Sequence, residues 1–369
     1  MSKNILIVGG GTGGHISPGI ALYEKMSEDG SLNPIFLTGS NDMRFASFGD
    51  IDPDRLFTYE PPALTTNILK LPLFSVKFFK AMLKAMSILR KNRIDAVVGM
   101  GGYASAPALV AAKIKKIPIF LCEQNSVPGK VTVKMEVHAV KIFATFDESR
   151  KYLMSPSKFI LAGNPIRNNI LVDIPKEEAK KNFHLSHCQK IILVIGGSQG
   201  ALRLNELVLG LRKKYHKDFK NIGVIWSTGD FSYEEYKERA TNEIDAGSVY
   251  ISPYIKKVGR AYRACDLCIS RSGSGVMMEL AAAGVPSILI PYPYAADNHQ
   301  EKNADAFVEA GAAVKISDKE ATPENVAPVL FELLNNKSKL KNMSDCARRV
   351  AKPDAAEIIV RSIKTELIK

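Results

Sequence analysis

The opening stretch ILIVGGGTGGH, residues 5–15, constrains the fold of this chain more than any other feature. Ile5 to Val8 form a short β-branched apolar run, which is typical of a strand buried on both faces of a parallel sheet. Five glycines follow within six residues, and glycine lets the backbone adopt positive φ and lets a ligand approach the main chain. Since residues 16–26 have a helical pattern, the stretch predicts a strand, a glycine turn and a helix N-terminus.

A turn of this kind presents unpaired N–H groups and the positive end of a helix dipole, which together favour a phosphate or another anion. Its glycines match the G-x-G-x-x-G fingerprint of dinucleotide-binding domains. In those domains an acidic residue near the end of the second strand holds the ribose, but PIFLTGSND ends its apolar run in Thr38 and Gly39, and Asp42 comes late. A nicotinamide dehydrogenase is therefore disfavoured. The alternative to an anion site is a tight turn that binds nothing.

His15 projects from the glycine turn itself, at the carboxyl edge of the predicted sheet, where ligands of α/β proteins bind. Its imidazole titrates near neutral pH, which suits a general base. His15 is therefore the candidate catalytic residue, against the alternative of an ordinary surface histidine.

The same pattern returns in KIILVIGGSQGALRLNELVLGL, residues 190–211, and 369 residues suffice for two domains. Strand-like and helical segments alternate through both halves, which indicates parallel sheets. We predict an α/β fold of two Rossmann-like, doubly wound domains that face each other across a cleft. The expected parts are an N-terminal domain (1–164), a C-terminal domain (165–350) and a C-terminal helix (351–369), and the N-terminal domain is the part on which that helix is expected to pack.

The net charge of +12 indicates anionic partners, such as phosphates, nucleic acid or an anionic membrane surface. Nucleic acid is not expected as a partner, since the sequence has no zinc-finger spacing, RNP-like aromatic motif or arginine-rich tail. Five cysteines, an odd and low number, indicate reduced thiols and a cytoplasmic location. Cys265 and Cys268 lie in a strand-like run and are expected to be structural. No signal segment or membrane-spanning run is evident.

Seven motifs occur in one order along the chain: GGGTGGH, GGYASAPA, EQNSVPG, GNPIR, GGSQGA, RSGSGVMMELAAAGVPSILIPYP and DNHQEKNA. This set resembles the MurG family over nearly the whole chain. Members of that family are peripheral membrane transferases of the GT-B fold type. They add N-acetylglucosamine from UDP-N-acetylglucosamine to undecaprenyl-diphosphate-linked muramoyl pentapeptide (lipid I), which gives lipid II. The resemblance implies the same hexosyltransferase activity in peptidoglycan synthesis, at the cytoplasmic face of the cell (inner) membrane. It also implies that residues 1–164 form the acceptor and membrane-associating domain and that residues 165–350 form the UDP-sugar-binding domain.

The resemblance also implies a site for UDP-N-acetylglucosamine. Its matching positions in this sequence are Thr12, Gly13, Gly14, Asn125, Arg167, Ser198, Ile255, Ser274, Gly275, Val276, Met277, Met278, Glu279 and Gln300.

Individual roles follow from the family. Asn125 is expected to bind sugar hydroxyls and Gln300 to contact the transferred sugar. The backbone at Ile255 is expected to read the uracil edge, and Glu279 to hold the two ribose hydroxyls, against the alternative of a solvent-facing helical glutamate. Arg167 is expected to reach the nucleotide as a permanent cation, against the alternative of a solvated linker arginine.

The implied reaction is displacement at the anomeric carbon by the 4-hydroxyl of the muramoyl sugar, with inversion. His15 is the expected base, while helix N-termini at Ser198 and at residues 274–276, with Arg167, are expected to stabilise the departing UDP. No Asp-x-Asp motif marks a metal site, so no tightly bound cofactor is expected, and no site for an assisting divalent cation is evident. The alternatives are a UDP-N-acetylglucosamine 2-epimerase of the same architecture and a non-catalytic nucleotide-sugar-binding scaffold.

One further segment, LPLFSVKFFKAMLKAMSILRKNRI, carries many cations and no acidic residue. Helical spacing predicts that Phe79, Met82, Met86 and Leu89 share one face, which packs on the sheet if this is an ordinary crossover helix. The lysines are spaced to share a different face. We expect binding to an anionic membrane surface, because each cation near such a bilayer contributes about 1 kcal/mol. The membrane residues expected are Phe74, Lys77, Phe78, Lys80 and Lys84.

Overall fold

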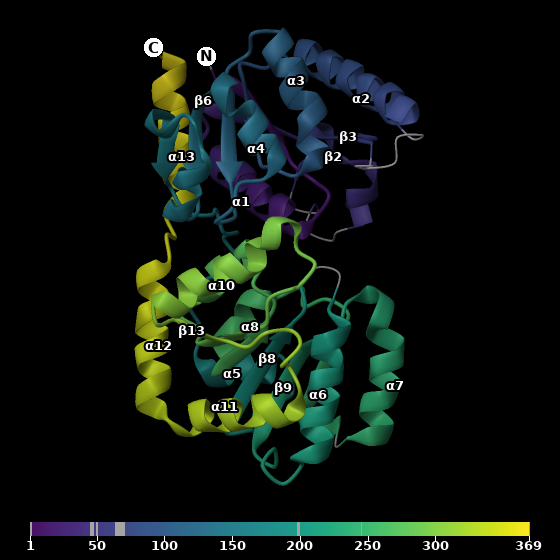
Figure 1. The fold of residues 1–369 in the computed structure, drawn as a ribbon, viewed down its shortest axis with the longest axis vertical. Coiled ribbons are helices and arrows are strands. Elements are labelled where there is room, and N and C mark those ends of the chain that lie inside the picture. The colour runs from purple at the N-terminus through teal and green to yellow at the C-terminus, as the bar shows by residue number, and fades with distance from the viewer. Residues whose placement is uncertain are drawn as a thin grey trace. The chain divides into compact units, whose positions relative to one another are not determined.

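The structure is a computed structural model that describes residues 2–44, 48, 51–62, 71–197, 200–244 and 246–368. The chain divides into two compact units (Figure 1). Unit 1 comprises Met1–Asn168 and Lys352–Lys369, and unit 2 comprises Asn169–Ala351. Each unit is an open parallel sheet with helices, which confirms the predicted fold class of two α/β domains.

Unit 1 is built on a sheet in which every recorded strand pair is parallel, in the order β3-β2-β1-β4-β5-β6-β7. Its strands are β1 (Lys3–Val8), β2 (Leu32–Gly39), β3 (Leu56–Tyr59), β4 (Ala96–Gly99), β5 (Ile119–Glu123), β6 (Ala139–Ala144) and β7 (Phe159–Leu161). Its α-helices are α1 (Gly13–Asp29), α2 (Leu71–Lys91), α3 (Ala106–Ile114), α4 (Lys130–Met135) and α13 (Ala355–Ile368). The strand order reverses at β1, and ligands of open α/β sheets bind at the carboxyl ends of the strands at such a switch point.

Both faces of this sheet are covered, which explains why β1 is an uninterrupted apolar run. Alternate residues of β1 enter two separate cores: Leu6 and Val8 pack with residues of α2 and α3, and Ile5 and Ile7 with residues of α1 and α13. Figure 1 shows α13, in yellow, among the elements of unit 1. Ile359 and Ile363 of α13 are fully buried there.

Unit 2 repeats the architecture with the strand order β10-β9-β8-β11-β12-β13, again with parallel pairs. Its strands are β8 (Lys190–Ile195), β9 (Ile222–Ser227), β10 (Val249–Ser252), β11 (Leu267–Ser270), β12 (Ser287–Leu289) and β13 (Ala313–Lys315). Its α-helices are α5 (Lys176–Lys181), α6 (Leu202–Lys214), α7 (Tyr233–Glu243), α8 (Val258–Ala264), α9 (Ser274–Ala283), α10 (His299–Glu309), α11 (Pro323–Asn335) and α12 (Lys337–Val350). The strand order reverses at β8, which is followed by a glycine turn and a helix, as β1 is.

The cation-rich segment forms α2, and its buried side includes three of the four predicted residues: Leu89 is buried, and Met82 and Met86 are half-buried against the core. Ala81, Ala85, Ile88 and Leu89 are buried, whereas Phe79 is 55% exposed. The prediction that Phe79 packs on the sheet is therefore wrong. The two alanines carry small side chains that let α2 approach α3 closely, so the alanine stripe, rather than the phenylalanine, faces the core.

All five cysteines are buried and free of disulfides, which confirms the structural role predicted for Cys265 and Cys268. Burial raises the pKa of the Cys265 thiol to about 12. Across the described ranges, none of the helices combines the length and the apolar character needed to span a bilayer.

Candidate active site

The turn between β1 and α1 carries the candidate base. His15 lies in the first turn of α1, and its Nδ1 is 2.9 Å from Oγ1 of Thr12, the N-cap residue. Gly101 and Gly102, which follow β4, have positive φ and lie against the imidazole. A Cβ atom at Gly102 would lie 2.9 Å from Nδ1, so bare backbone is needed for the ring to rest there. The structure thus places His15 at the switch point of the sheet.

The EQN segment is organised by a buried acid that the sequence analysis did not single out. Glu123, at the end of β5, is 3% exposed. Its Oε1 accepts a hydrogen bond from the N–H of Asn125 at 3.0 Å, and its Oε2 accepts from the N–H of Gly129 at 3.0 Å and from the hydroxyl of Thr132 at 2.6 Å. Burial raises the pKa of Glu123, and these three bonds act in the opposite direction. The available signal was an acidic residue directly after a buried strand.

The GNPIR segment ends unit 1. Arg167 is only 7% exposed, so it is not a solvated linker arginine. The next residue, Asn168, is held on α1, because its N–H donates to Glu24 at 3.2 Å and its side-chain amide donates to Glu28 at 2.6 Å. Arg167 is therefore carried by an anchored segment of unit 1.

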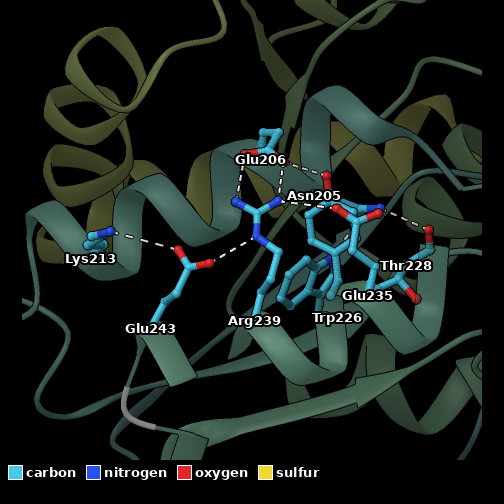
Figure 2. Close-up of polar contacts among 9 residues, drawn as sticks. Asn205, Glu206, Lys213, Trp226, Thr228, Glu235, Arg239 and Glu243 are labelled. Atoms are coloured by element: carbon cyan, nitrogen blue, oxygen red, sulfur yellow. Dashed lines mark hydrogen bonds and ion pairs between the residues drawn. The ribbon is translucent and has the colours of Figure 1, made fainter. Parts of the chain in front are cut away.

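In unit 2, the second glycine turn follows β8, and its Ser198 lies outside the described residues. Gly200 has a φ of 77° and packs on the main chain of Thr228, where a Cβ atom would lie 2.2 Å from the carbonyl oxygen. That carbonyl accepts a hydrogen bond from the side-chain amide of Asn205 at 3.0 Å, and Asn205 accepts one from the indole N–H of Trp226 at 2.9 Å (Figure 2). Asn205 is thus a supporting residue that the sequence analysis missed, although a polar residue on the apolar face of α6 signals it.

Figure 2 also shows a charged network between α6 and α7. The Arg239 guanidinium donates to Glu206 and to Glu243, and Lys213 pairs with Glu243. Lys213 and Glu206 are exposed and Arg239 and Glu243 are partly exposed at the helix surface, so we assign the network to holding α7 on α6.

Helix α9 begins at Ser274, directly after Gly273. The first N–H groups of a helix, here those of Ser274, Gly275 and Val276, have no acceptor within the helix and favour an anion. Met277 and Met278 are buried, so their side chains belong to the core.

Glu279, one turn further along α9, is 7% exposed and accepts a hydrogen bond from the Tyr262 hydroxyl of α8 at 2.7 Å. It is therefore not the solvent-facing helical glutamate of the alternative interpretation.

Gln300, in the first turn of α10, is tied to two other loops of this edge. Its Oε1 accepts from the N–H of Tyr292 at 3.0 Å, and its carbonyl accepts from the hydroxyl of Ser272 at 2.8 Å. Arg271, which the sequence analysis missed, donates to the carbonyls of Ile290 and Pro291 at 3.1 Å and pairs with Asp318 at 2.5 Å. A basic residue directly after a buried strand was its signal.

Ile255 follows β10 and is 5% exposed, which suits a role for its main chain rather than its side chain.

Within each unit, the parallel sheet brings the predicted site residues together at the carboxyl ends of its strands. Unit 1 places Thr12, Gly13, Gly14, His15 and Asn125 after its strands, and unit 2 does the same for Ile255, residues 274–279 and Gln300. The described residues contain no cluster of three or more His, Cys, Asp or Glu side chains suited to a metal ion.

Comparison with known proteins matches residues 5–144 to the Glycosyltransferase family 28 N-terminal domain and residues 191–359 to its C-terminal domain. The sequence is 34% identical over 367 residues to the UDP-N-acetylglucosamine–N-acetylmuramyl-(pentapeptide) pyrophosphoryl-undecaprenol N-acetylglucosamine transferase of Desulforamulus reducens, with 97% of each chain covered. Among solved structures, Acinetobacter baumannii MurG is 26% identical, with a TM-score of 0.72 and coverage of 98% of this chain and 99% of that one.

A putative UDP-N-acetylglucosamine 2-epimerase from Listeria monocytogenes has a similar fold, with a TM-score of 0.73 at 16% identity and coverage of 99% and 97% of the two chains. At that identity the likeness concerns the fold alone. The relative from Desulforamulus reducens, in contrast, is 34% identical over nearly the full length of both chains, and both domains of glycosyltransferase family 28 match. This chain therefore belongs to the MurG family of glycosyltransferases.

Proposed function

We propose that this protein transfers N-acetylglucosamine from UDP-N-acetylglucosamine to the 4-hydroxyl of the muramoyl sugar of lipid I, with inversion at the anomeric carbon. The observation that carries the proposal is the arrangement of unit 2, where Glu279, the N-terminus of α9 and Gln300 lie at one edge of one sheet. These groups supply a carboxylate for ribose hydroxyls, N–H donors for a diphosphate and an amide for a sugar.

In the donor site, the buried Glu279 carboxylate accepts from the ribose hydroxyls while Tyr262 keeps it in place. The N–H groups of Ser274, Gly275 and Val276, with Ser198 of the second glycine turn and Arg167, offset the charge that develops on the departing UDP. The main chain at Ile255 reads the uracil. Gln300 contacts the sugar through its side-chain NH₂, because its side-chain oxygen Oε1 already accepts a hydrogen bond from the N–H of Tyr292.

In unit 1, His15 removes the proton of the attacking hydroxyl, with Thr12, Gly13, Gly14 and Asn125 around the sugar. A base at this position needs the tautomer in which Nδ1–H donates to Thr12 Oγ1, because Nε2 is then the unprotonated nitrogen that can accept a proton. The electron pair of the attacking oxygen forms the new glycosidic bond as the bond to UDP breaks.

The experiment incubates the purified chain with UDP-N-acetylglucosamine and a lipid I analogue and measures UDP release and the disaccharide product. Transfer predicts UDP release only when the acceptor is present. A 2-epimerase would instead convert UDP-N-acetylglucosamine without any acceptor, and a scaffold would bind the nucleotide sugar and leave it intact.

We further propose that α2 holds the protein reversibly at the cytoplasmic leaflet of the cell membrane. Its solvent-facing side carries an apolar stripe of large side chains, namely Leu73, Val76, Phe79 and Leu83, which are 48–58% exposed. Lys77, Lys80 and Lys84 are exposed beside this stripe. An exposed helix face with both features suits the interface of an anionic bilayer, the apolar side chains in the acyl region and the lysines at the headgroups.

Phe74 and Phe78, which are also predicted membrane residues, make aromatic contacts within unit 1. Their rings stack at a centroid distance of 6.2 Å, and Phe74 also packs on Tyr103 at 5.9 Å. Both are half-buried, so they brace the start of α2 while the exposed apolar stripe makes the proposed membrane contact.

A further inference from the structure

The first glycine turn already holds an anion, which is supplied by the protein itself. Asp42 lies in the 3₁₀ helix η1 (Ser40–Arg44) after β2 and is 6% exposed. Its Oδ2 accepts hydrogen bonds from the N–H of Gly11 at 3.0 Å, from the N–H of Gly39 at 3.1 Å and from the hydroxyl of Thr38 at 3.1 Å. The carboxylate thus links the glycine turn to the end of the neighbouring strand.

Two glycines of this region are explained by the carboxylate. A Cβ atom on Gly10 would lie 2.3 Å from Asp42 Oδ2, and one on Gly39 would lie 2.8 Å from the same atom. Both distances are shorter than side chains tolerate, so glycine at these positions makes room for Asp42. The bare backbone that suggested a phosphate-binding turn therefore accommodates an internal acid.

The Asp42 carboxylate is held by hydrogen-bond donors of the surrounding chain. Among the described side chains no Lys, Arg or His forms an ion pair with it, and its Oδ2 accepts hydrogen bonds from two backbone N–H groups and one hydroxyl. A carboxylate that accepts several such bonds at a helix N-terminus is favoured by the helix dipole. A second anion approaching the same turn would meet this negative charge at short range.

We propose that Asp42 replaces a ligand phosphate in the first glycine turn. In this role it is a positioning residue, because it holds the turn that carries Thr12 and His15. It also determines specificity, because its charge keeps a nucleotide diphosphate out of unit 1 and leaves unit 2 as the single donor site. The positioning role rests on the proposed function, because its test measures transferase kinetics. The exclusion of a diphosphate from unit 1 is tested by binding alone and does not rest on it.

The kinetic test uses the full-length chain with Asp42→Asn, which keeps the shape and removes the charge. The matched control is Asp95→Asn, since Asp95 accepts from the N–H of Asn4 at 2.8 Å at the opposite, amino end of β1. We expect Asp42→Asn to lower kcat by about tenfold or more with the KM for UDP-N-acetylglucosamine within about twofold, and Asp95→Asn to leave kcat unchanged. Equal effects of the two variants on kcat, or a donor KM that rises while kcat stays, would overturn the positioning role.

A second set of variants covers the case in which Asp42→Asn fails to fold, as judged by circular dichroism. Gly10→Ala alone should displace the carboxylate and lower kcat, whereas Gly10→Ala combined with Asp42→Ala should lose no more activity than Asp42→Ala alone. Independent, additive losses would show that Gly10 and Asp42 do not act on each other, and would overturn the proposal.

The anion test needs no turnover and therefore stands even if the transferase proposal fails. Inorganic pyrophosphate is titrated into the wild-type chain saturated with UDP, and the Gly11 amide is followed by NMR. We expect no shift of that amide in the wild type and a saturable shift in Asp42→Asn. A saturable shift in the UDP-saturated wild type, or none in the variant, would contradict the exclusion.

Discussion

The hydroxyl oxygen of Thr12 lies 2.9 Å from Nδ1 of His15, so this contact engages one of the two imidazole nitrogens. A serine or threonine in this place restricts the ring in the way that a carboxylate or carbonyl does in other histidine bases. The contact therefore ties the orientation of the base to the N-cap of α1.

His15→Ala should lower turnover by about a hundredfold or more while UDP-N-acetylglucosamine affinity changes by no more than about threefold, because only proton removal is lost. Thr12→Val should lower kcat by a smaller factor, on the order of tenfold, through loss of ring orientation. His138→Ala, an exposed histidine of the same unit, is the control. Near-normal turnover in His15→Ala would remove His15 as the base.

Glu279→Gln should weaken UDP binding by roughly 1–3 kcal/mol, the usual range for loss of a charge-assisted hydrogen bond. Tyr262→Phe should have a smaller effect in the same direction, because it removes only the 2.7 Å bond that holds the carboxylate. Isothermal titration calorimetry with UDP measures both. Unchanged affinity in Glu279→Gln would show that the carboxylate has a purely structural partner in Tyr262.

Changing Lys77, Lys80 and Lys84 together to Gln should reduce sedimentation with liposomes that contain anionic lipid. In the wild type, binding should weaken as salt rises, because each lysine contributes about 1 kcal/mol at an anionic surface. The matched control changes three exposed lysines of unit 2, Lys217, Lys220 and Lys237, to Gln. Equal losses in both variants would indicate nonspecific attraction of a basic protein.

The apolar stripe of α2 has its own test. Val76→Ser with Phe79→Ser should weaken liposome binding at every salt concentration, because both side chains are more than half exposed and removing them leaves the core intact. If binding persists in this variant at high salt, the apolar contact lies elsewhere on the protein.

The five cysteines should not react with a thiol reagent in the native protein at pH 8. Burial raises the pKa of Cys265 to about 12 and that of Cys268 well above its usual value, so their thiols stay protonated and shielded. A colorimetric thiol titration should find no fast-reacting groups in the folded chain and all five after denaturation. Rapid modification of any thiol in the folded protein would contradict the buried arrangement.

Much of the fold could be predicted from the sequence, because parallel strands buried on both faces leave continuous apolar runs. The run at Ile5 to Val8 and its counterpart at Ile191 to Ile195 both form the switch-point strands. In α2, periodicity correctly identified Met82, Met86 and Leu89 as core-facing but wrongly added Phe79, because α2 also carries an exposed apolar stripe that the pattern does not separate from the packed one. The alanines decide the matter, since close approach of two helices needs small side chains.

The site was harder to predict where side chains form hydrogen bonds with main-chain groups of other segments. Asp42 comes too late for a ribose ligand at the end of β2, and nothing in its local sequence says that the chain folds back to bring it under the glycine turn. Asn205 and Arg271 likewise act through contacts with residues distant in sequence. A pattern in a single sequence describes the spacing of residues within one helix or strand. It does not show which residues from distant parts of the chain come into contact.

The most direct measurement of the central claim is UDP release by the purified chain in the presence and absence of a lipid I analogue, with the product identified by mass spectrometry. We predict UDP release that depends on the acceptor and a product heavier than the acceptor by one N-acetylglucosamine residue, both lost in His15→Ala. Conversion of UDP-N-acetylglucosamine to its 2-epimer without acceptor, or no turnover with a native acceptor under membrane-like conditions, would contradict assignment as a lipid I transferase.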